Sequence, residues 1–195
     1  IDPVNNMVSS GNALPLPVII GTEGRIPPSM VIEDDATGDV DTTGVFDPAS
    51  DGIDFYESLE GMLVQVNDAV AVGPTSSYGE IAVVADAGIN AGLLNSRGSL
   101  VIRSNDFNPE RIILDDVIIS LPEVSVGERF AGDIIGVMDY SYGNFKLLVT
   151  GFPVPSAASV SQETAPTRTS EELSVATFNV ENLDPLDDPS KFQKL

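Results

Sequence analysis

Alternating apolar and polar residues divide most of this chain into short predicted strands. Residues 62–72 form a long run that predicts one strand, or a strand with a bulge, and residues 80–85 form a second run. The Gly, Pro and Ser of residues 73–79 supply turn chemistry, so the two runs predict a hairpin. Further β-branched runs between Gly, Pro, Asn and Asp clusters predict strands at residues 99–103, 111–114, 117–119, 129–138 and 144–149. No segment shows a sustained helical period.

Short strands at this spacing are typical of a closed or nearly closed barrel. We therefore predict an all-β fold, an OB-like antiparallel β-barrel, for residues 1–152. Residues 153–172 are rich in Pro, Ser and Thr and predict a linker. Residues 173–195 then predict the truncated start of a further domain, and residues 173–183 alternate like its first strand. We expect this strand to be an orphan that lacks its parent sheet. Such a strand is not stable by itself.

The charge of the chain limits the partners that it can bind. Its 195 residues carry a net charge of −21, and no Lys or Arg occurs between Ile26 and Ser96. Such a surface repels phosphate, whereas non-specific nucleic-acid binding normally depends on a basic stripe. The chain has no Cys, which excludes a disulfide framework and a thiol nucleophile. It also has no apolar run long enough to span a bilayer, so we expect no membrane partner.

Carboxylates lie close together in two Gly-containing loops, residues 33–41 and 47–54. Oxygen-rich loops of this kind can hold Ca²⁺, although neither loop has the EF-hand spacing. The candidate Ca²⁺ ligands are Asp34, Asp35, Asp39 and Asp41. The alternative is a solvated acidic loop that keeps the protein soluble.

Four residues are the candidate nucleic-acid contacts: Arg97, Arg103, Phe107 and Arg111. The ring of Phe107 could stack on a single-stranded base, and the three cations could contact phosphates if the fold gathers them. Two alternatives remain open. In the first, the cations are scattered solubilising charges, and in the second, Phe107 is buried beside the Asn-Pro turn that follows it.

The last predicted strand carries a pattern of its own. Residues 173–183 read LSVATFNVENL, and their alternation puts apolar side chains on one face and Asn179 and Glu181 on the other. An amide and a carboxylate at a strand end present hard oxygen ligands that can hold a divalent cation or orient a phosphate. The string resembles the opening strand of the endonuclease/exonuclease/phosphatase superfamily, the metal-dependent phosphodiesterases to which DNase I-like nucleases belong.

The resemblance implies a catalytic role for this strand in a longer protein. It would place Asn179 beside the scissile phosphate and Glu181 near the metal site, with Mg²⁺ or Mn²⁺ as cofactor and nucleic acid as substrate. The family's chemistry needs further residues from later strands, including His, and this chain has no His. We therefore predict that the chain itself does not hydrolyse phosphodiesters.

Three motifs in the predicted barrel carry a second resemblance. Residues 60–64, 126–130 and 136–140 read EGMLV, VGERF and GVMDY. They are similar to the OB-like β domain that precedes the catalytic domain in secreted, sugar-non-specific bacterial nucleases. The resemblance implies an extracellular or periplasmic accessory domain that positions substrate or its own catalytic domain. The alternative is an acidic extracellular structural or adhesive β module that Ca²⁺ would stabilise.

Overall fold

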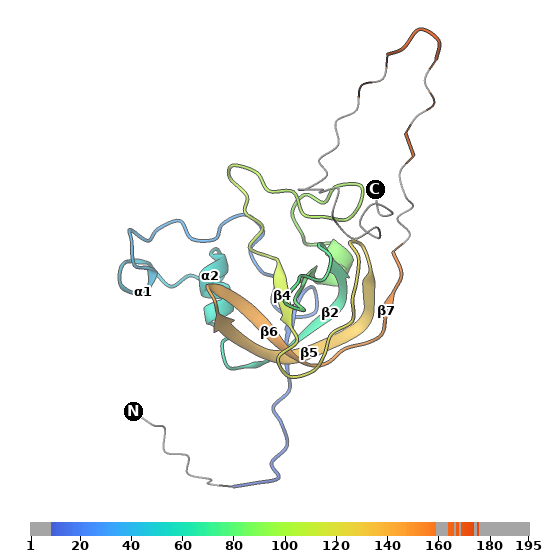
Figure 1. Cartoon of the computed structure of the whole chain (residues 1–195). Helices are drawn as coiled ribbons and strands as arrows, with labels where there is room; N and C mark the ends of the chain where they lie inside the picture. The colour runs from blue at the N-terminus through green and yellow to red at the C-terminus, as the bar shows by residue number, and fades with distance from the viewer. Residues whose placement is uncertain (1–8, 159–163, 166, 168, 174, 176–195) are drawn as a thin grey trace, which may run out of the picture. The chain divides into compact units, whose positions relative to one another are not determined.

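The computed structural model describes residues 9–158, 164–165, 167, 169–173 and 175. The chain divides into two compact units, Ile1–Val160 and Ser161–Leu195. All the helices and strands named below belong to the first unit (Figure 1). The predicted C-terminal strand, with Asn179 and Glu181, lies outside the described residues.

The described part of the chain forms one seven-stranded sheet and three short helices. The strands are β1 (Val18–Ile20), β2 (Leu63–Ala71), β3 (Ile81–Val84), β4 (Ile112–Asp115), β5 (Arg129–Ser141), β6 (Asn144–Gly151) and β7 (Pro155–Ser156). The helices are α1 (Val40–Thr43), α2 (Gly52–Glu57) and the 3₁₀ helix η1 (Asp86–Gly88). None of the helices in the described residues is long and apolar enough to cross a membrane.

Five of the strands close into a barrel. The ring runs from β2 through β3, β4, β6 and β5 and back to β2. In chain order these are the first, second, third, fifth and fourth ring strands, which is the connectivity of the OB-fold. The predicted all-β, OB-like barrel is therefore confirmed. β1 and β7 extend the sheet by pairing with β2 and β5.

Two pairings in this mainly antiparallel sheet are parallel. β4 and β6 run parallel, and so do β1 and β2, while the other ring pairings are antiparallel. The physical reason for the first is geometric. Strand directions cannot alternate all the way round a closed ring with an odd number of strands, so one neighbouring pair must run in the same direction.

Alternation along the ring strands fills the barrel with apolar side chains. Val64 and Val66 of β2 and Phe130, Ile134 and Met138 of β5 are fully or almost fully buried. Burying each such side chain contributes about 1.5–3 kcal/mol. α2 belongs to the same core through two further buried side chains, Phe55 and Leu59 just beyond the helix end.

A bulge in β2 helps the sheet to curve. The register between β2 and β5 shifts between Asn67 and Ala69, and Asp68 lies there with a positive φ of 44°. The Asp68 Oδ1 accepts a hydrogen bond of 3.0 Å from the backbone N–H of Gly132 on β5. Bulges of this kind increase the local twist and allow a strand to turn a barrel corner.

Most of the predicted strands are present, but two are not. Residues 99–103 form only isolated bridges, Leu94 to Leu100 and Arg103 to Asp106. Residues 117–119 form no strand, because the Asp115 Oδ1 accepts the backbone N–H of Val117 and turns the chain out of β4. α1 and α2 have four and six residues, too few for a helical period to show in the sequence.

Candidate functional site

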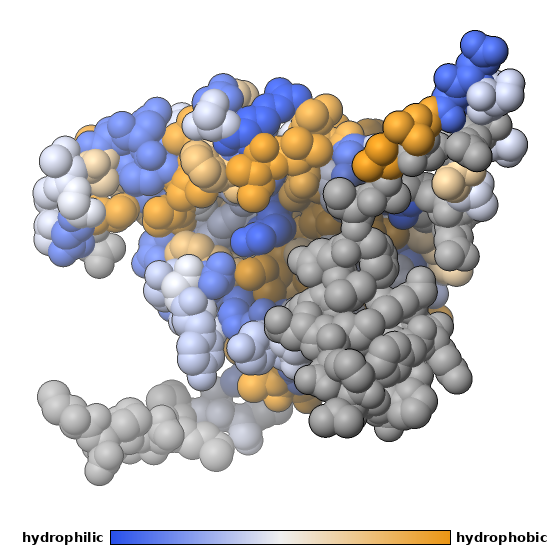
Figure 2. All heavy atoms as spheres, turned by 45° about the horizontal axis from the view of Figure 1, so that its top comes forward, coloured by the Kyte–Doolittle hydropathy of each residue, from blue (hydrophilic) through white to orange (hydrophobic). Residues whose placement is uncertain are grey.

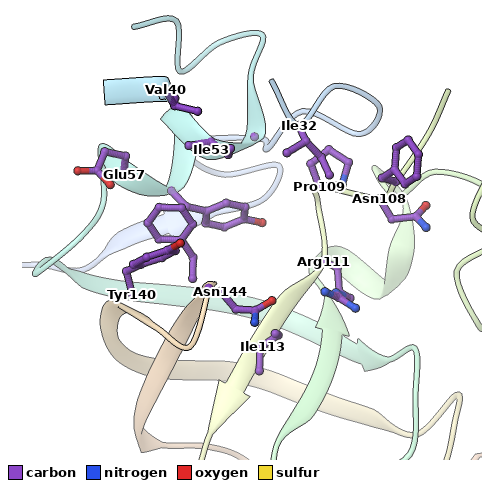
Figure 3. A pocket seen from close by; sticks show the side chains of 15 residues that line it. Ile32, Val40, Ile53, Glu57, Asn108, Pro109, Arg111, Ile113, Tyr140 and Asn144 are labelled. Atoms are coloured by element: carbon purple, nitrogen blue, oxygen red, sulfur yellow. The ribbon is translucent and has the colours of Figure 1, made fainter. Parts of the chain in front are cut away.

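A groove of about 470 Å³ lies at the end of the barrel where β5 turns into β6. Figure 3 shows its two walls. One wall is formed by Ile32 from the loop before α1, Val40 from α1 and Ile53 from α2. On the other wall, Arg111 lies just before β4 and Asn144 lies at the start of β6. The groove is therefore built from segments that are far apart in the sequence.

Aromatic side chains form a continuous series along the groove. The rings of Tyr140 and Phe145 have centroids 4.8 Å apart, and those of Phe145 and Tyr56 are stacked with centroids 5.8 Å apart. All three side chains line the groove, as does Phe107. Tyr140 is 52% exposed and Phe107 is 57% exposed, so both offer ring surface to a ligand.

The tight β5–β6 turn presents part of this series. Tyr142 and Gly143 join the strands with φ angles of 52° and 75°, the combination that a type I′ hairpin turn requires. The turn pairs Tyr140 with Phe145 and Ser141 with Asn144. Because the hairpin loop is only two residues long, Tyr140 and Asn144 are held on rigid strands instead of a long loop.

A buried hydroxyl in this region has no hydrogen-bond partner. Tyr56 is buried, and its hydroxyl makes no hydrogen bond within the described residues. Burial raises the pKa of this phenol, and the nearby Glu110 carboxylate raises it further. The hydroxyl is therefore neutral, and it can donate to or accept from a ligand group that reaches it.

The loop before β4 buries several polar groups beside the groove. Asp106 Oδ1 accepts the backbone N–H of Asn108 at 3.1 Å, and Asn108 has a positive φ of 56°. Glu110 Oε1 accepts the backbone N–H of Gly92 at 2.7 Å, and burial raises the pKa of Glu110. A Cβ at Gly92 would lie 3.1–3.4 Å from side-chain oxygens of these three residues, so this position suits Gly. These contacts fix the loop that presents Phe107.

The location of the groove agrees in part with the way OB-folds bind ligands, since its lining includes no residue of the second ring strand, β3. OB-folds bind oligonucleotides and oligosaccharides over their second and third strands and beside the loop between the fourth and fifth. Here the groove is lined by Ile113 on the third ring strand, β4, and by Gly143 in the turn between the fourth and fifth. Its lining contains no His or Cys, and its charged members are Glu57 and Arg111. The arrangement is that of a binding groove with little net charge.

The structure brings together two of the four predicted nucleic-acid contacts. Phe107 and Arg111 both line the groove, and Phe107 is exposed. Arg103 begins the same loop, where its backbone bridges to Asp106, but it does not line the groove. Arg97 lines a separate hollow of about 440 Å³ beside Pro74. Asn144 was not among the predicted contacts, because only barrel closure places it in the groove with Phe107.

Carboxylates from two loops converge at a second place. Oxygens of Glu33, Asp35 and Asp51 all lie within 4.8 Å of one another. The Oε1 of Glu33 accepts the backbone N–H groups of Asp35 and Ala36, both at 2.9 Å, and these bonds hold the Glu33 pKa below its usual value. Burial, together with the charges of Asp34 and the other nearby carboxylates, raises the pKa of Asp51 to about 6.

The predicted Ca²⁺ ligands only partly coincide with this cluster. Asp35 belongs to it, while Asp34 is exposed and acts on Asp51 through its charge. Asp39 is exposed, and its carbonyl oxygen accepts the backbone N–H groups of the α1 residues Thr42 and Thr43. Asp41 lies in α1, and its side chain is outside the description. Glu33 and Asp51 were missed, because nothing in the sequence shows that the two acidic loops meet.

Apolar surface is not confined to the groove. Figure 2 shows apolar side chains running across one face of the molecule between hydrophilic areas. The exposed large apolar side chains include Phe46, Ile118 and Leu93, which lie on loops and not in the groove lining. Scattered apolar residues of this kind are normal on a protein surface and identify no site by themselves.

Comparison with known proteins identifies a family for the barrel. The model of one family, described as a domain of unknown function (DUF8508), matches residues 19–159. No curated protein and no solved structure matches the chain. The matched residues begin in β1, include every ring strand and end beyond β7, so the family model covers the whole barrel. The chain therefore belongs to the DUF8508 family.

Proposed function

We propose that this chain is a non-catalytic accessory domain of a secreted, metal-dependent nuclease and that its groove holds single-stranded substrate. The observation that carries the proposal is the aromatic groove beside the turn between the fourth and fifth strands of an OB-like barrel, one of the loops at which OB-folds bind ligands. Tyr140 and Phe107 offer exposed rings on which bases can stack, and base stacking is tolerant of sequence. The C-terminal string that resembles the endonuclease/exonuclease/phosphatase superfamily supports the same proposal.

The electrostatics of the groove define how such a substrate would be held. The chain has a net charge of −21, and Arg111 is the cation in the groove lining. Phosphate contacts therefore supply little of the binding energy, in contrast to most single-strand binders. Stacking on the two exposed rings supplies most of it, at about 1–3 kcal/mol per base. Affinity is modest, which suits a domain that passes substrate to a neighbour.

The catalytic part of the proposal belongs to the longer protein. Mg²⁺ or Mn²⁺ would be held there by the domain that starts with residues 173–195, with Glu181 near the metal and Asn179 near the phosphate. The barrel would act as a partner of that domain, in the extracellular space or the periplasm. Pure samples of this chain should leave DNA intact in either metal, and cleavage by a contamination-controlled sample would contradict this.

Fluorescence anisotropy with a labelled oligothymidine of about 15 nucleotides tests the groove, since OB-folds cover up to about that length. Binding should weaken about 10-fold in Phe107→Ala and in Tyr140→Ala, because each loses one stacking surface. The log–log salt slope should be about −1 or shallower, and Arg111→Gln should bring it close to zero. Tyr78→Ala is the matched control, because Tyr78 is 81% exposed and lies outside the groove. Absence of binding at low salt, or equal losses in Tyr78→Ala, would overturn the proposal.

A second candidate function is an acidic extracellular structural or adhesive module. The cluster of Glu33, Asp35 and Asp51 favours it, since extracellular modules often use Ca²⁺ to hold loops. The two functions differ in the groove, which a purely structural module does not need. Loss of oligothymidine binding in Phe107→Ala therefore supports the accessory domain and counts against the structural module.

A further inference from the structure

The acidic cluster contains polar atoms whose contacts are incomplete. Asp51 is only 1% exposed, and its Oδ1 has no hydrogen-bond partner among the described residues. Within the described part of the chain, the Oε2 of Glu33 is also buried without a partner, although the Oε1 of the same side chain accepts two backbone N–H groups. A buried carboxylate oxygen without a partner is costly, and each such atom in a folded protein calls for an explanation.

The charge around these atoms makes the arrangement more costly still. Glu33, Asp35 and Asp51 bring three carboxylates within 4.8 Å of one another. Asp34 and Asp54 add further negative charge close to Asp51. The sequence places no Lys or Arg between Ile26 and Ser96 to offset it. Like charges this close repel strongly unless a cation lies between them.

We infer that Glu33, Asp35 and Asp51 form a Ca²⁺ site that joins the loop before α1 to the start of α2. Ca²⁺ takes carboxylate oxygens at about 2.3–2.6 Å in flexible geometry, so opposite ligands lie up to about 5 Å apart. The three oxygens all lie within 4.8 Å of one another, which is inside this limit. Mg²⁺ fits less well, because it requires about 2.0–2.1 Å and near-ideal octahedral geometry. Water and other oxygens would complete the coordination.

The site has a definite structural role. The backbone N–H groups of Gly52 and Ile53 donate to the carbonyl oxygens of Val31 and Ile32, both at 3.0 Å. These two hydrogen bonds join the segments that carry the three carboxylates. Ile32, Gly52 and Ile53 also line the groove, so the ion would hold one wall of it in place. The inference goes beyond the proposed function and does not rest on what the groove binds.

Isothermal titration of chelator-treated protein with CaCl₂ tests the inference. We expect one ion per chain with a Kd of about 10⁻⁴ M, as in extracellular modules. At Ca²⁺ concentrations about 100 times the Kd, the melting temperature should rise by about 5–10 °C, and by less in equal Mg²⁺. Hydrogen exchange at residues 31–35 and 51–54 should slow on Ca²⁺ addition.

Paired variants separate coordination from general charge. Asp51→Asn and Glu33→Gln should weaken Ca²⁺ binding at least 10-fold, whereas Asp34→Asn keeps all three ligands and should weaken it less than 3-fold. Asp133→Asn removes the same charge from the exposed surface of β5 and should leave the affinity unchanged. In chelator, the melting temperature of Asp51→Asn should be no lower than that of the wild type. This result would show that the variant is folded. An unchanged wild-type melting temperature in Ca²⁺ and chelator, or equal losses in Asp51→Asn and Asp133→Asn, would refute the site.

Discussion

Lys146 offers the sharpest test of the energetics of the barrel. It lies on β6, where its side chain points away from the core and yet is only 6% exposed. Its Nζ donates to Glu80 Oε1 and, at 3.2 Å, to Asp115 Oδ2. The same nitrogen lies 5.2 Å from the ring centroid of Tyr142. One cation therefore bridges two carboxylates, Glu80 just before β3 and Asp115 at the end of β4.

The magnitude of the effect of Lys146→Met follows from these contacts. With an effective dielectric constant of about 20, a charge pair at 3.2 Å attracts by about 5 kcal/mol, and desolvation of the lysine offsets much of that. Removing one partner of a buried pair costs about 3–5 kcal/mol. The Glu80 and Asp115 side chains remain 24% and 15% exposed, and solvent screens the charges left behind. We expect a loss of about 2–3 kcal/mol, or about 5–10 °C in melting temperature.

The pH dependence gives the prediction a second readout. Hydrogen bonding to Glu80, followed by that to Asp115, raises the pKa of Lys146 above its usual value. A raised pKa in the folded state means that the ion cluster stabilises the protein fully below about pH 10.4, the unfolded value. That stability is lost as the pH rises through the folded pKa. The difference between wild type and Lys146→Met should therefore be constant from pH 7 to 9 and shrink above about pH 10.4.

Urea unfolding followed by far-UV circular dichroism measures both effects, and the chain has no Trp to serve as an alternative probe. The triple variant Lys146→Met, Glu80→Gln, Asp115→Asn is the matched control, because it removes the whole ion cluster. It should recover most of the loss, since a neutral replacement leaves no unpaired charge. A Lys146→Met variant within about 0.5 kcal/mol of wild type would refute the reasoning, because surface substitutions typically fall in that range.

Two further substitutions test packing and polar burial. Gly136→Ala should destabilise the barrel by about 1–3 kcal/mol, because a Cβ there would lie 2.5 Å from the backbone oxygen of Leu148. Gly151→Ala, where a Cβ has nothing within 4 Å, should stay within about 0.5 kcal/mol in the same urea titration, and equal effects would contradict the packing argument. Tyr56→Phe removes a buried hydroxyl without a partner and should leave stability unchanged or raise it by up to about 1 kcal/mol. If Tyr56→Phe lowered the free energy of unfolding by more than about 1.5 kcal/mol, the hydroxyl would have a hydrogen-bond partner and the expectation would be wrong.

The ring strands could be predicted from the sequence because each has a strand pattern within its own residues. Residues 62–72 and 129–138 alternate apolar and polar side chains over enough positions to reveal a strand, and they became β2 and β5. The three-residue β1 has no such length, and its place beside β2 depends on a partner more than forty residues away. Residues 117–119 are β-branched, but a side-chain hydrogen bond from Asp115 turns the chain there.

The groove and the acidic cluster, too, could be predicted only in part from the sequence. Phe107 and Arg111 could be paired from the sequence because only three residues separate them on one loop. Tyr140 joins them only because β5 and β6 complete the ring beside β4. Likewise, the acidic loops are visible in the sequence, but the meeting of Asp51 with Glu33 depends on the backbone bonds that join α2 to residues 31 and 32.

Local alternation, turn residues and charge thus determined by themselves that the chain is all-β, barrel-like and strongly acidic. Only the tertiary structure decided the parallel β4–β6 pairing, the walls of the groove and the identity of the clustered carboxylates. The physical reason is that periodicity and turn chemistry act over a few residues. Barrel closure and loop contact depend on long-range packing, and packing arises only when distant segments are brought together.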